Sequence, residues 1–427
     1  MFKEESHSIK IWLMNKFISE SFINIVLRGA TLLSKFIFIF LLGKFAEDEY
    51  FLGEYGIITT SISLIIYLVG FDFYVFNTRE ILKSKESIIE KIRNQFFFHF
   101  IAYSFVLPLT LIIIFYFDFI DIKYFLIVFL LIISEHLGQE LFRLYTTLEK
   151  SNIANLFFFI KSGLWVWVVL FDFFILKNEL DLLKYLIIWA SCSWISMVLS
   201  MIYLRKIIFI RNFKFHRPNY SWILKGVKNS SIFFISSLSF LVIQFSDRYM
   251  IDFFYGKKMV GVYSAYSQFV NAIDVFIFSA IIMVIYPKLI QLFSDRAAYK
   301  DLFKKLKKYI LIASIALIIV SYFVMPTLFG FLDKPSFLLN IETFNVLLIG
   351  AFFLLMSYSY HYDLYIKKKD TLLLKISLLS MSLNIVLNLC LIPNNGLFGA
   401  SLATMISFFV LFLLKLIYSK HKIYGRI

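Results

Sequence analysis

The sequence predicts an all-α polytopic membrane protein with about 12 transmembrane helices in two six-helix lobes and both termini in the cytoplasm. Three observations predict this class: the composition, the length of the apolar segments, and the alternation of positive charge between connections. Hydrophobic residues make up 60% of the 427 residues, charged residues only 17%, and the mean hydropathy is +0.80. A soluble chain holds about 45–50% apolar residues. The function of this chain must therefore be performed inside a membrane.

Nearly the whole chain consists of apolar segments that are long enough to cross a bilayer, since about 20 apolar residues span the hydrocarbon core as a helix. We predict helices at residues 17–42, 53–76, 95–117, 122–145, 152–176, 183–204, 230–254, 259–286, 309–331, 341–365, 371–392 and 397–418. The connections are too short for a catalytic domain, and none contains the phosphate-binding sequence GxxxxGK[ST]. We therefore expect no enzyme activity.

The orientation follows from the distribution of Lys and Arg. Most of the 43 basic residues fall on the termini and on every second connection, including the basic stretches 205–228 and 288–308. Cytoplasmic connections carry an excess of Lys and Arg, so both termini are predicted to be cytoplasmic. The net charge of +15 is then mainly an orientation signal, and we expect no nucleic-acid partner.

The two halves of the chain contain similar sequence patterns. The predicted N-terminal lobe is 1–204 with helices 1 to 6, the basic cytoplasmic linker is 205–228, and the C-terminal lobe is 229–427 with helices 7 to 12. A Gly-Lys pair ends helix 1 and helix 7, and a similar turn opens the helix that follows: Leu52-Gly53-Glu54-Tyr55-Gly56 in one half and Val260-Gly261-Val262-Tyr263-Ser264 in the other. This pattern predicts a parallel repeat of six helices.

Helix 1 carries a polar stripe within an apolar segment. Its members recur at steps of three and four residues, which places them on one face: Ser21, Asn24, Arg28, Thr31 and Lys35. Arg28 falls near the middle of the membrane, where an ionisable group should face a bundle interior or a water-filled cavity. We predict that Arg28, Lys35 and, from helix 7, Arg248 line a polar lumen between the two halves.

Other polar groups are candidates for the lumen or for binding a coupling ion. They are Asp247, Asp274, Glu135, Asn271 and Gln244. A structural interpretation stays open for all of them, because such groups also pair across helices. Asp247 can neutralise Arg248, and Lys35 can extend toward the membrane surface. We expect no catalytic residues, no cofactor and no metal site, since the six His show no ligand spacing and Cys192 and Cys390 resemble small hydrophobic residues.

The cationic lumen favours an anionic cargo, and Arg suits phosphate because its planar fork donates to pairs of oxygens. Carboxylates such as Asp274 or Glu135 can bind a proton or Na⁺ and couple transport to an ion gradient. The sequence does not distinguish the two ions.

Several stretches carry a resemblance to a known family. They are the two Gly-x-Tyr turns, Ser246-Asp247-Arg248-Tyr249-Met250, and the run from Asn384 and Asn388 to Gly399-Ala400-Ser401. The chain resembles the Wzx-type polysaccharide-repeat (O-antigen or capsule) flippases of the multidrug/oligosaccharidyl-lipid/polysaccharide (MOP) exporter superfamily. This resemblance implies a V-shaped exporter in the bacterial inner membrane, which passes an undecaprenyl-diphosphate-linked oligosaccharide to the outer leaflet. Arg28, Lys35 and Arg248 would then contact the cargo phosphates.

The resemblance also implies partners: the lipid-linked oligosaccharide, membrane lipids, and the polymerase and ligase of a surface-polysaccharide pathway, with the chain itself a monomer. A cation-coupled multidrug exporter is an alternative, but a drug cation favours an acidic lumen. A flippase for the peptidoglycan precursor usually has more helices. A membrane polysaccharide polymerase or ligase requires a large outer loop, which the sequence does not predict.

Overall fold

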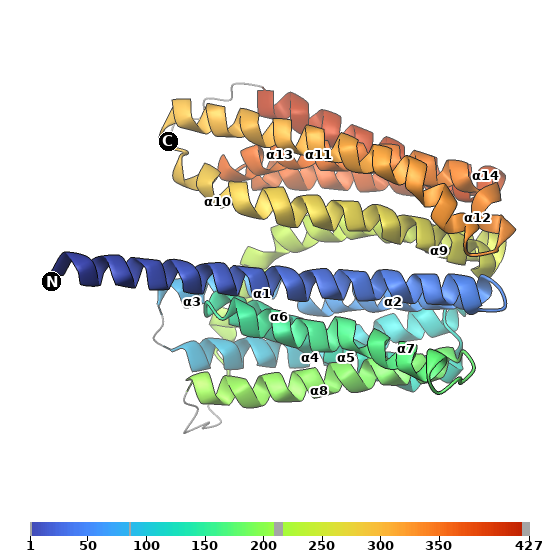
Figure 1. The fold of residues 1–427 in the computed structure, drawn as a ribbon, viewed down its shortest axis with the longest axis horizontal. Helices are drawn as coiled ribbons and strands as arrows, with labels where there is room; N and C mark the ends of the chain where they lie inside the picture. Colours follow the sequence, from blue (N-terminus) through green and yellow to red (C-terminus); the bar gives the residue numbers. More distant parts are fainter. Residues whose placement is uncertain (1, 85–86, 209–216, 421–427) are drawn as a thin grey trace. The chain divides into compact units, whose positions relative to one another are not determined.

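The computed structural model describes residues 2–84, 87–208 and 217–420, apart from the side chains of residues 2–22, 25 and 208, and contains only helices within them (Figure 1). The first half forms α1 (Phe2–Phe45), α2 (Tyr50–Gly70), α3 (Phe73–Lys83), α4 (Ile88–Tyr116), η1 (Ile122–Tyr124), α5 (Phe125–Thr147), α6 (Ser151–Phe159), η2 (Ile160–Leu164), α7 (Trp165–Phe174) and α8 (Leu182–Ile208). The second half forms α9 (Tyr220–Ile277), η3 (Phe278–Ile282), α10 (Met283–Gln291), α11 (Arg296–Gly330), α12 (Pro335–Leu339), α13 (Ile341–Ile366) and α14 (Asp370–Lys420).

The predicted number of transmembrane segments is confirmed. Ten helical stretches in the described residues are long and apolar enough to cross a membrane. Two of them, in α9 and α14, contain a glycine with non-helical dihedrals, Gly256 at φ 77° and Gly396 at φ 54°. A positive φ suits glycine because it has no Cβ, and each glycine divides its stretch into two spans. The orientation of the termini stays a prediction.

The α9 helix begins ten residues before the predicted start of helix 7, inside the predicted linker. Asn219 explains this start, because its side-chain oxygen accepts hydrogen bonds from the backbone N–H of Trp222 at 3.1 Å and the hydroxyl of Ser221 at 2.8 Å. This is the role of a helix N-cap. The first turns then bury Ile223 against Phe73. Residues 209–216 of the predicted linker lie outside the described residues.

The α11 helix likewise begins earlier than predicted, at Arg296, and includes much of the second basic stretch. The Asp295 side chain accepts hydrogen bonds from the backbone N–H groups of Ala297 and Ala298 at 3.0 and 3.1 Å. One turn further on, Lys305 pairs with Asp301 at 2.7 Å. A capped N-terminus and ion pairs four residues apart stabilise a polar helix outside the membrane, so the charged segment continues the apolar helix.

The chain divides into two compact units. One consists of Met1–Phe38 and Ile65–Val227, and we call it the N-terminal unit. The other, the C-terminal unit, consists of Ile39–Leu64 and Lys228–Ile427. The C-terminal end of α1 and the N-terminal part of α2 thus belong to the unit that holds the second half of the chain. The predicted lobe boundaries at 204 and 229 stay a prediction.

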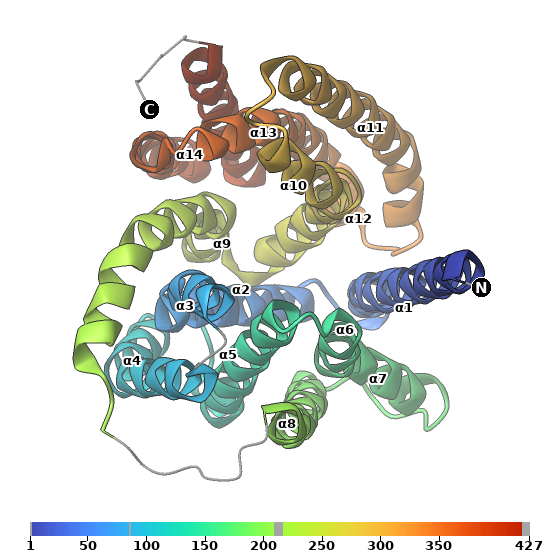
Figure 2. The ribbon, with the colours of Figure 1, turned by 90° about the vertical axis from the view of Figure 1, so that its left-hand side faces the viewer.

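In the N-terminal unit, α5 lies between α4 and α8 (Figure 2). Tyr145 on α5 is fully buried, and its hydroxyl donates to the carbonyl oxygen of Ser200 on α8 at 2.5 Å. The neighbouring span is interrupted by the π-helical turn η2, which contains Lys161. Such turns are frequent at functional sites, and this one holds a buried cation.

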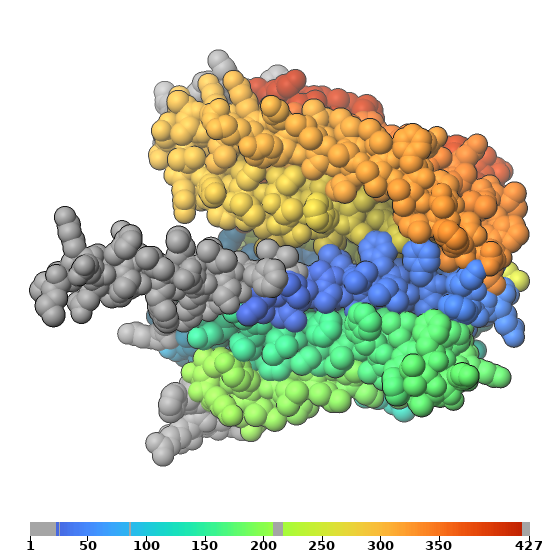
Figure 3. Space-filling model, in the orientation of Figure 1, coloured from blue at the N-terminus to red at the C-terminus, as the bar shows by residue number. Residues whose placement is uncertain are grey.

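In the C-terminal unit, α13 packs along α14 (Figure 2), and α11 covers one face (Figure 3). The two predicted repeat turns contact one another directly in this unit. A Cβ on Gly53 would lie 1.9 Å from the carbonyl oxygen of Lys257, and one on Gly261 would lie 2.2 Å from that of Glu49. Only glycine permits so close a backbone approach, so the glycines of the two turns are explained by their mutual contact.

Candidate functional site

The middle of the predicted polar stripe on α1 contacts α6. Arg28 is half-buried, and its Nε donates to the side-chain oxygen of Asn155 at 3.0 Å. The amide nitrogen of Asn155 donates in turn to the side-chain oxygen of Asn24 at 2.7 Å. Asn155 therefore holds the Arg28 guanidinium in place on one side. Asn155 was not predicted from the sequence, because its partners lie on another helix.

The rest of the stripe is divided between buried and exposed positions. Thr31 is buried, and its hydroxyl donates to the carbonyl oxygen of Leu27 at 2.8 Å. Lys35, one turn further, is exposed and lies within electrostatic range of Glu135 and Lys161. The side chain of Ser21 lies outside the described residues. Arg28 and Lys35 are thus the accessible cations of the stripe.

Glu135 forms a buried ion pair beside Lys35. Lys161 Nζ donates to Oε2 at 2.7 Å, while Oε1 accepts hydrogen bonds from Trp189 Nε1 at 2.9 Å and Ser193 Oγ at 3.2 Å. A buried carboxylate with a cation and two further donors is fully satisfied. This arrangement favours the structural interpretation of Glu135. Lys161 was not predicted from the sequence, although a lone cation in the middle of an apolar segment indicates a polar contact.

Arg248 is enclosed in the C-terminal unit, with only 3% of its surface exposed. Its Nη1 donates to the backbone carbonyl of Gln244 at 2.7 Å, and its Nη2 donates to Ser267 Oγ at 2.6 Å. The carboxylate of Asp247 lies 3.8 Å from Nη1. In this conformation Arg248 is bound within its own unit and is not accessible as Arg28 and Lys35 are.

Asp247 is buried with it, in a group of polar side chains. The hydroxyl of Tyr263 donates to Oδ2, and the backbone N–H of Arg248 donates to Oδ1 at 2.8 Å. On α14, the amide nitrogen of Asn388 donates to the side-chain oxygen of Asn384 at 3.1 Å. The Nδ2 of Asn384 and the Oδ1 of Asn388 have no hydrogen-bond partner among the described residues.

Asp274 and Asn271 lie further along α9 and are both half-buried. The Asp274 carboxyl interacts with the hydroxyl of Tyr358, but its Oδ1 has no hydrogen-bond partner in the described part of the chain. A buried carboxylate oxygen without a donor is costly unless a cation or a proton occupies it. Asp274 therefore stays a candidate for ion binding.

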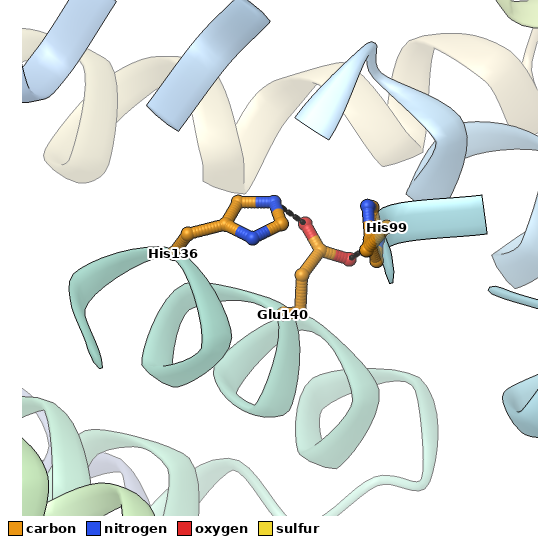
Figure 4. A group of neighbouring side chains, drawn as sticks. All are labelled: His99, His136 and Glu140. Atoms are coloured by element: carbon orange, nitrogen blue, oxygen red, sulfur yellow. Dashed lines mark ion pairs between the residues drawn. The ribbon is translucent and has the colours of Figure 1, made fainter. Parts of the chain in front are cut away.

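A second polar cluster, between α4 and α5, was not predicted. It contains His99, His136 and Glu140, all buried in the N-terminal unit (Figure 4). His136 and Glu140 are four residues apart on α5 and so share a face, but the position of His99 beside them depends on the packing of α4.

Comparison with known proteins identifies the architecture. A family model described as polysaccharide biosynthesis protein matches residues 17–293. The structure of a lipid II flippase, MurJ, in an inward closed conformation is 16% identical at a TM-score of 0.71, covering 94% of this chain and 87% of its own. A multidrug resistance transporter of the MATE family and MOP superfamily, in an inward-facing conformation, is 12% identical at a TM-score of 0.67, covering 93% and 94%. No curated protein sequence matches the chain.

At these identities the solved structures show a common fold and nothing finer. The predicted fold class, an all-α polytopic membrane protein with the fold of MOP-superfamily exporters, is confirmed. The resemblance drawn from the sequence is confirmed as well, since both the family model and the folds agree with it. The substrate, the coupling ion and the roles of individual residues stay predictions.

Proposed function

The chain belongs to the polysaccharide biosynthesis protein family, and on this premise we propose that it is a flippase of the bacterial inner membrane. Its proposed cargo is an undecaprenyl-diphosphate-linked oligosaccharide repeat unit destined for a surface polysaccharide such as O-antigen or capsule. The observation that supports this cargo is the accessible pair of cations, Arg28 and Lys35, on the polar stripe of α1.

A diphosphate requires donors that keep their charge and their position. The guanidinium of Arg28 stays protonated in proteins and presents parallel N–H groups to phosphate oxygens. Its hydrogen bond to Asn155 fixes its orientation before the cargo arrives, which lowers the entropic cost of binding. Lys35 lies seven residues along the same face, about 10 Å away at 1.5 Å per residue. The two cations thus offer successive contacts to a headgroup that moves along α1.

We assign Arg248 a structural role in this conformation. Its guanidinium donates to Gln244 and Ser267 within the C-terminal unit, so cargo could reach it only after these bonds open. Removing Arg248 would leave Asp247 buried without its cation, which is strongly destabilising. Variants of Arg248 therefore report on folding as well as on transport.

We further propose that transport is coupled to an ion gradient through a carboxylate of α9. Asp247 and Asp274 are the candidates, since Asp247 is buried and Asp274 is half-buried with an oxygen that has no hydrogen-bond partner among the described residues. The coupling ion is a proton or Na⁺. In inverted vesicles, Asp274→Asn should reduce gradient-driven uptake of a lipid-linked oligosaccharide while leaving its binding unchanged. Unchanged uptake would remove Asp274 from the proposal.

The test of the cargo is complementation of a deletion in the host. We expect the deletion to abolish surface polysaccharide and to accumulate lipid-linked units on the cytoplasmic side. Arg28→Ala and Lys35→Met should each restore little polymer at normal protein levels, whereas Arg28→Lys should restore part of it. Arg205→Ala serves as the matched control, because Arg205 is exposed at the end of α8, outside the stripe.

Full polymer output from Arg28→Ala would refute the phosphate assignment. Units accumulating on the outer side would indicate a polymerase or ligase instead. An unchanged surface with new drug sensitivity would support a cation-coupled multidrug exporter, the alternative that the MATE-like fold allows. The two accessible cations on α1 oppose this alternative, since they repel a cationic drug.

A further inference from the structure

Three buried side chains meet between α4 and α5 in the arrangement of a metal site (Figure 4). His99 Nε2 lies 3.6 Å from Oε2 of Glu140, and His136 Nε2 lies 4.0 Å from Oε1. One donor atom from each residue lies within 4.8 Å of the other two. We infer that His99, His136 and Glu140 bind a transition-metal ion of the Zn²⁺ class. This inference is independent of the proposed cargo.

The donor atoms are farther apart than they are around a bound ion. Ligands at 2.0–2.1 Å from Zn²⁺ in a tetrahedron are about 3.4 Å apart. His99 and His136 lie 3.6 and 4.0 Å from different oxygens of Glu140, and one donor atom from each of the three residues lies within 4.8 Å of the other two. The two imidazole rings are 4.6 Å apart between centroids and nearly perpendicular. Binding an ion therefore requires the side chains to rotate toward one carboxylate oxygen.

The second ring nitrogen of His136 is held as in known metal sites. His136 Nδ1 and the Tyr103 hydroxyl share a hydrogen bond of 2.6 Å, whereas His136 Nε2 is buried without a hydrogen-bond partner among the described residues. Metal-ligating His residues almost always bond through their other nitrogen to a neighbouring group, which fixes the ring. Tyr103 takes this place, and it leaves Nε2 directed at the cluster.

Gln95 supplies the fourth position. Its Nε2 lies 3.3 Å from His99 Nε2 and also donates to Glu140 Oε2. The amide N–H groups of Gln95 thus lie against the His99 nitrogen and the Glu140 oxygen that would bind an ion. A half-turn of this amide presents its oxygen to the same point, since the two ends of an amide are nearly equal in size. Asn77 has to turn with it, because its Nδ2 donates to Gln95 Oε1 in this conformation, while its Oδ1 has no hydrogen-bond partner among the described residues. The site then holds two nitrogen and two oxygen donors.

The cluster has a charged neighbour and a small pocket beside it. Arg143 Nη1 donates to Glu140 Oε1 at 2.5 Å, and the buried carboxylate of Asp72 also acts on Arg143. A bound ion would therefore share the Glu140 carboxylate with the Arg143 guanidinium. His99 and Glu140, with Gln95, also line a pocket between α4 and α5.

The donor set selects the kind of ion. Imidazole nitrogens together with carboxylate suit Zn²⁺, Co²⁺ or Ni²⁺, whereas Mg²⁺ and Ca²⁺ prefer oxygen ligands only. The sequence predicted no metal, because His99 and the pair on α5 are far apart along the chain. A bound ion would cross-link α4 to α5 and stabilise the N-terminal unit against unfolding.

The test uses the full chain, purified in detergent through a tag without histidines and freed of metal by a chelator. Titration with Co²⁺ should give saturable binding of one ion per chain with the intense visible absorption of a four-coordinate site, and Zn²⁺ should displace it. Tyr103→Phe should weaken Co²⁺ binding about 10–100-fold, as expected for loss of the group that holds a ligand. His99→Gln and His136→Gln should abolish the absorption. His361→Gln, on α13, is the matched control and should change nothing.

Thermal unfolding without metal verifies that each variant is folded, and Tyr103→Phe keeps the test valid if the histidine variants misfold. Absence of saturable Co²⁺ binding to the wild-type chain would overturn the inference. Equal Co²⁺ affinity in the wild type and in folded Tyr103→Phe and His136→Gln would overturn it too. Binding that is lost in His361→Gln would place the ion elsewhere and would equally refute this site.

Discussion

The buried pair of Glu135 and Lys161 should show strong energetic coupling. Their charged groups are 2.7 Å apart, with side chains 10% and 6% exposed. Removing one partner of a buried pair typically costs about 3–5 kcal/mol, whereas replacing both by neutral groups is often nearly neutral. We therefore expect Lys161→Met and Glu135→Gln each to destabilise the chain by about 3–5 kcal/mol, and the double variant to cost less than either.

The structure also predicts which single variant is worse. Glu135→Gln leaves Lys161 and Lys35 near one another without an anion, since Glu135 is the group that offsets their mutual repulsion. Lys161→Met keeps the aliphatic stem that packs over Gly138. It also leaves Glu135 with its hydrogen bonds to Trp189 and Ser193. We place Glu135→Gln near the upper end of the range and Lys161→Met near the lower end.

The assay is unfolding in mixed micelles by increasing SDS, followed through the fluorescence of the 6 Trp residues. Lys305→Met is the matched control, because its pair with Asp301 is exposed at 55% and 63% and should contribute about 0–1 kcal/mol. The double-variant cycle gives the coupling free energy directly. Additive effects of Glu135→Gln and Lys161→Met, within about 0.5 kcal/mol, would refute the reasoning and return Glu135 to the candidates for ion binding.

Three further predictions concern local contacts. Gly261→Ala places a Cβ 2.2 Å from the carbonyl oxygen of Glu49 and should destabilise the chain by about 1–3 kcal/mol in the same unfolding assay. Gly330→Ala, whose Cβ meets nothing within 4 Å, should not. Asn219→Ala removes the cap of α9 and should cost about 1 kcal/mol in that assay. Finally, the Lys258 ammonium hydrogen-bonded to Asp48 holds the pKa of that carboxyl below its usual value. A carboxyl with a lowered pKa stabilises the fold above its unfolded value of about 3.9 and loses that contribution as the pH falls through the folded pKa. Asp48→Asn should therefore differ from wild type by a constant amount from about pH 5 to 8, and the difference should vanish in stronger acid.

The helices could be predicted because each apolar segment has to satisfy its backbone hydrogen bonds internally in a membrane. Their ends could not, because polar caps extend helices beyond the apolar part, as Asn219 does for α9 and Asp295 for α11. The glycine breaks in α9 and α14 fall where the sequence placed the connections between spans. Hydropathy thus predicted the spans and said little about the water-exposed turns.

The site was predicted less completely, since periodicity reports only which residues share one helix face. The stripe of Arg28 and Lys35 is of that kind. Asn155, which orients Arg28, and Lys161, which pairs with Glu135, come from a neighbouring span. No spacing within one helix can indicate such partners. The burial of Arg248 could not be predicted either, because its hydrogen-bond acceptors are a backbone carbonyl and a serine hydroxyl.

The contact between the two repeat turns has polar surroundings that suit a reversible closure. Its centre is the approach of backbone to backbone at Gly53 and Gly261, beside the buried side chains of Leu52 and Val260. The ion pairs around it, Lys258 with Asp48 and Lys44 with Asp333, are largely exposed, and exposed pairs each contribute only about 0–1 kcal/mol. By contrast, the Arg248 bonds are buried and costly to break. If the proposed flippase alternates between states, we expect the repeat turns to separate while the Arg248 bonds persist.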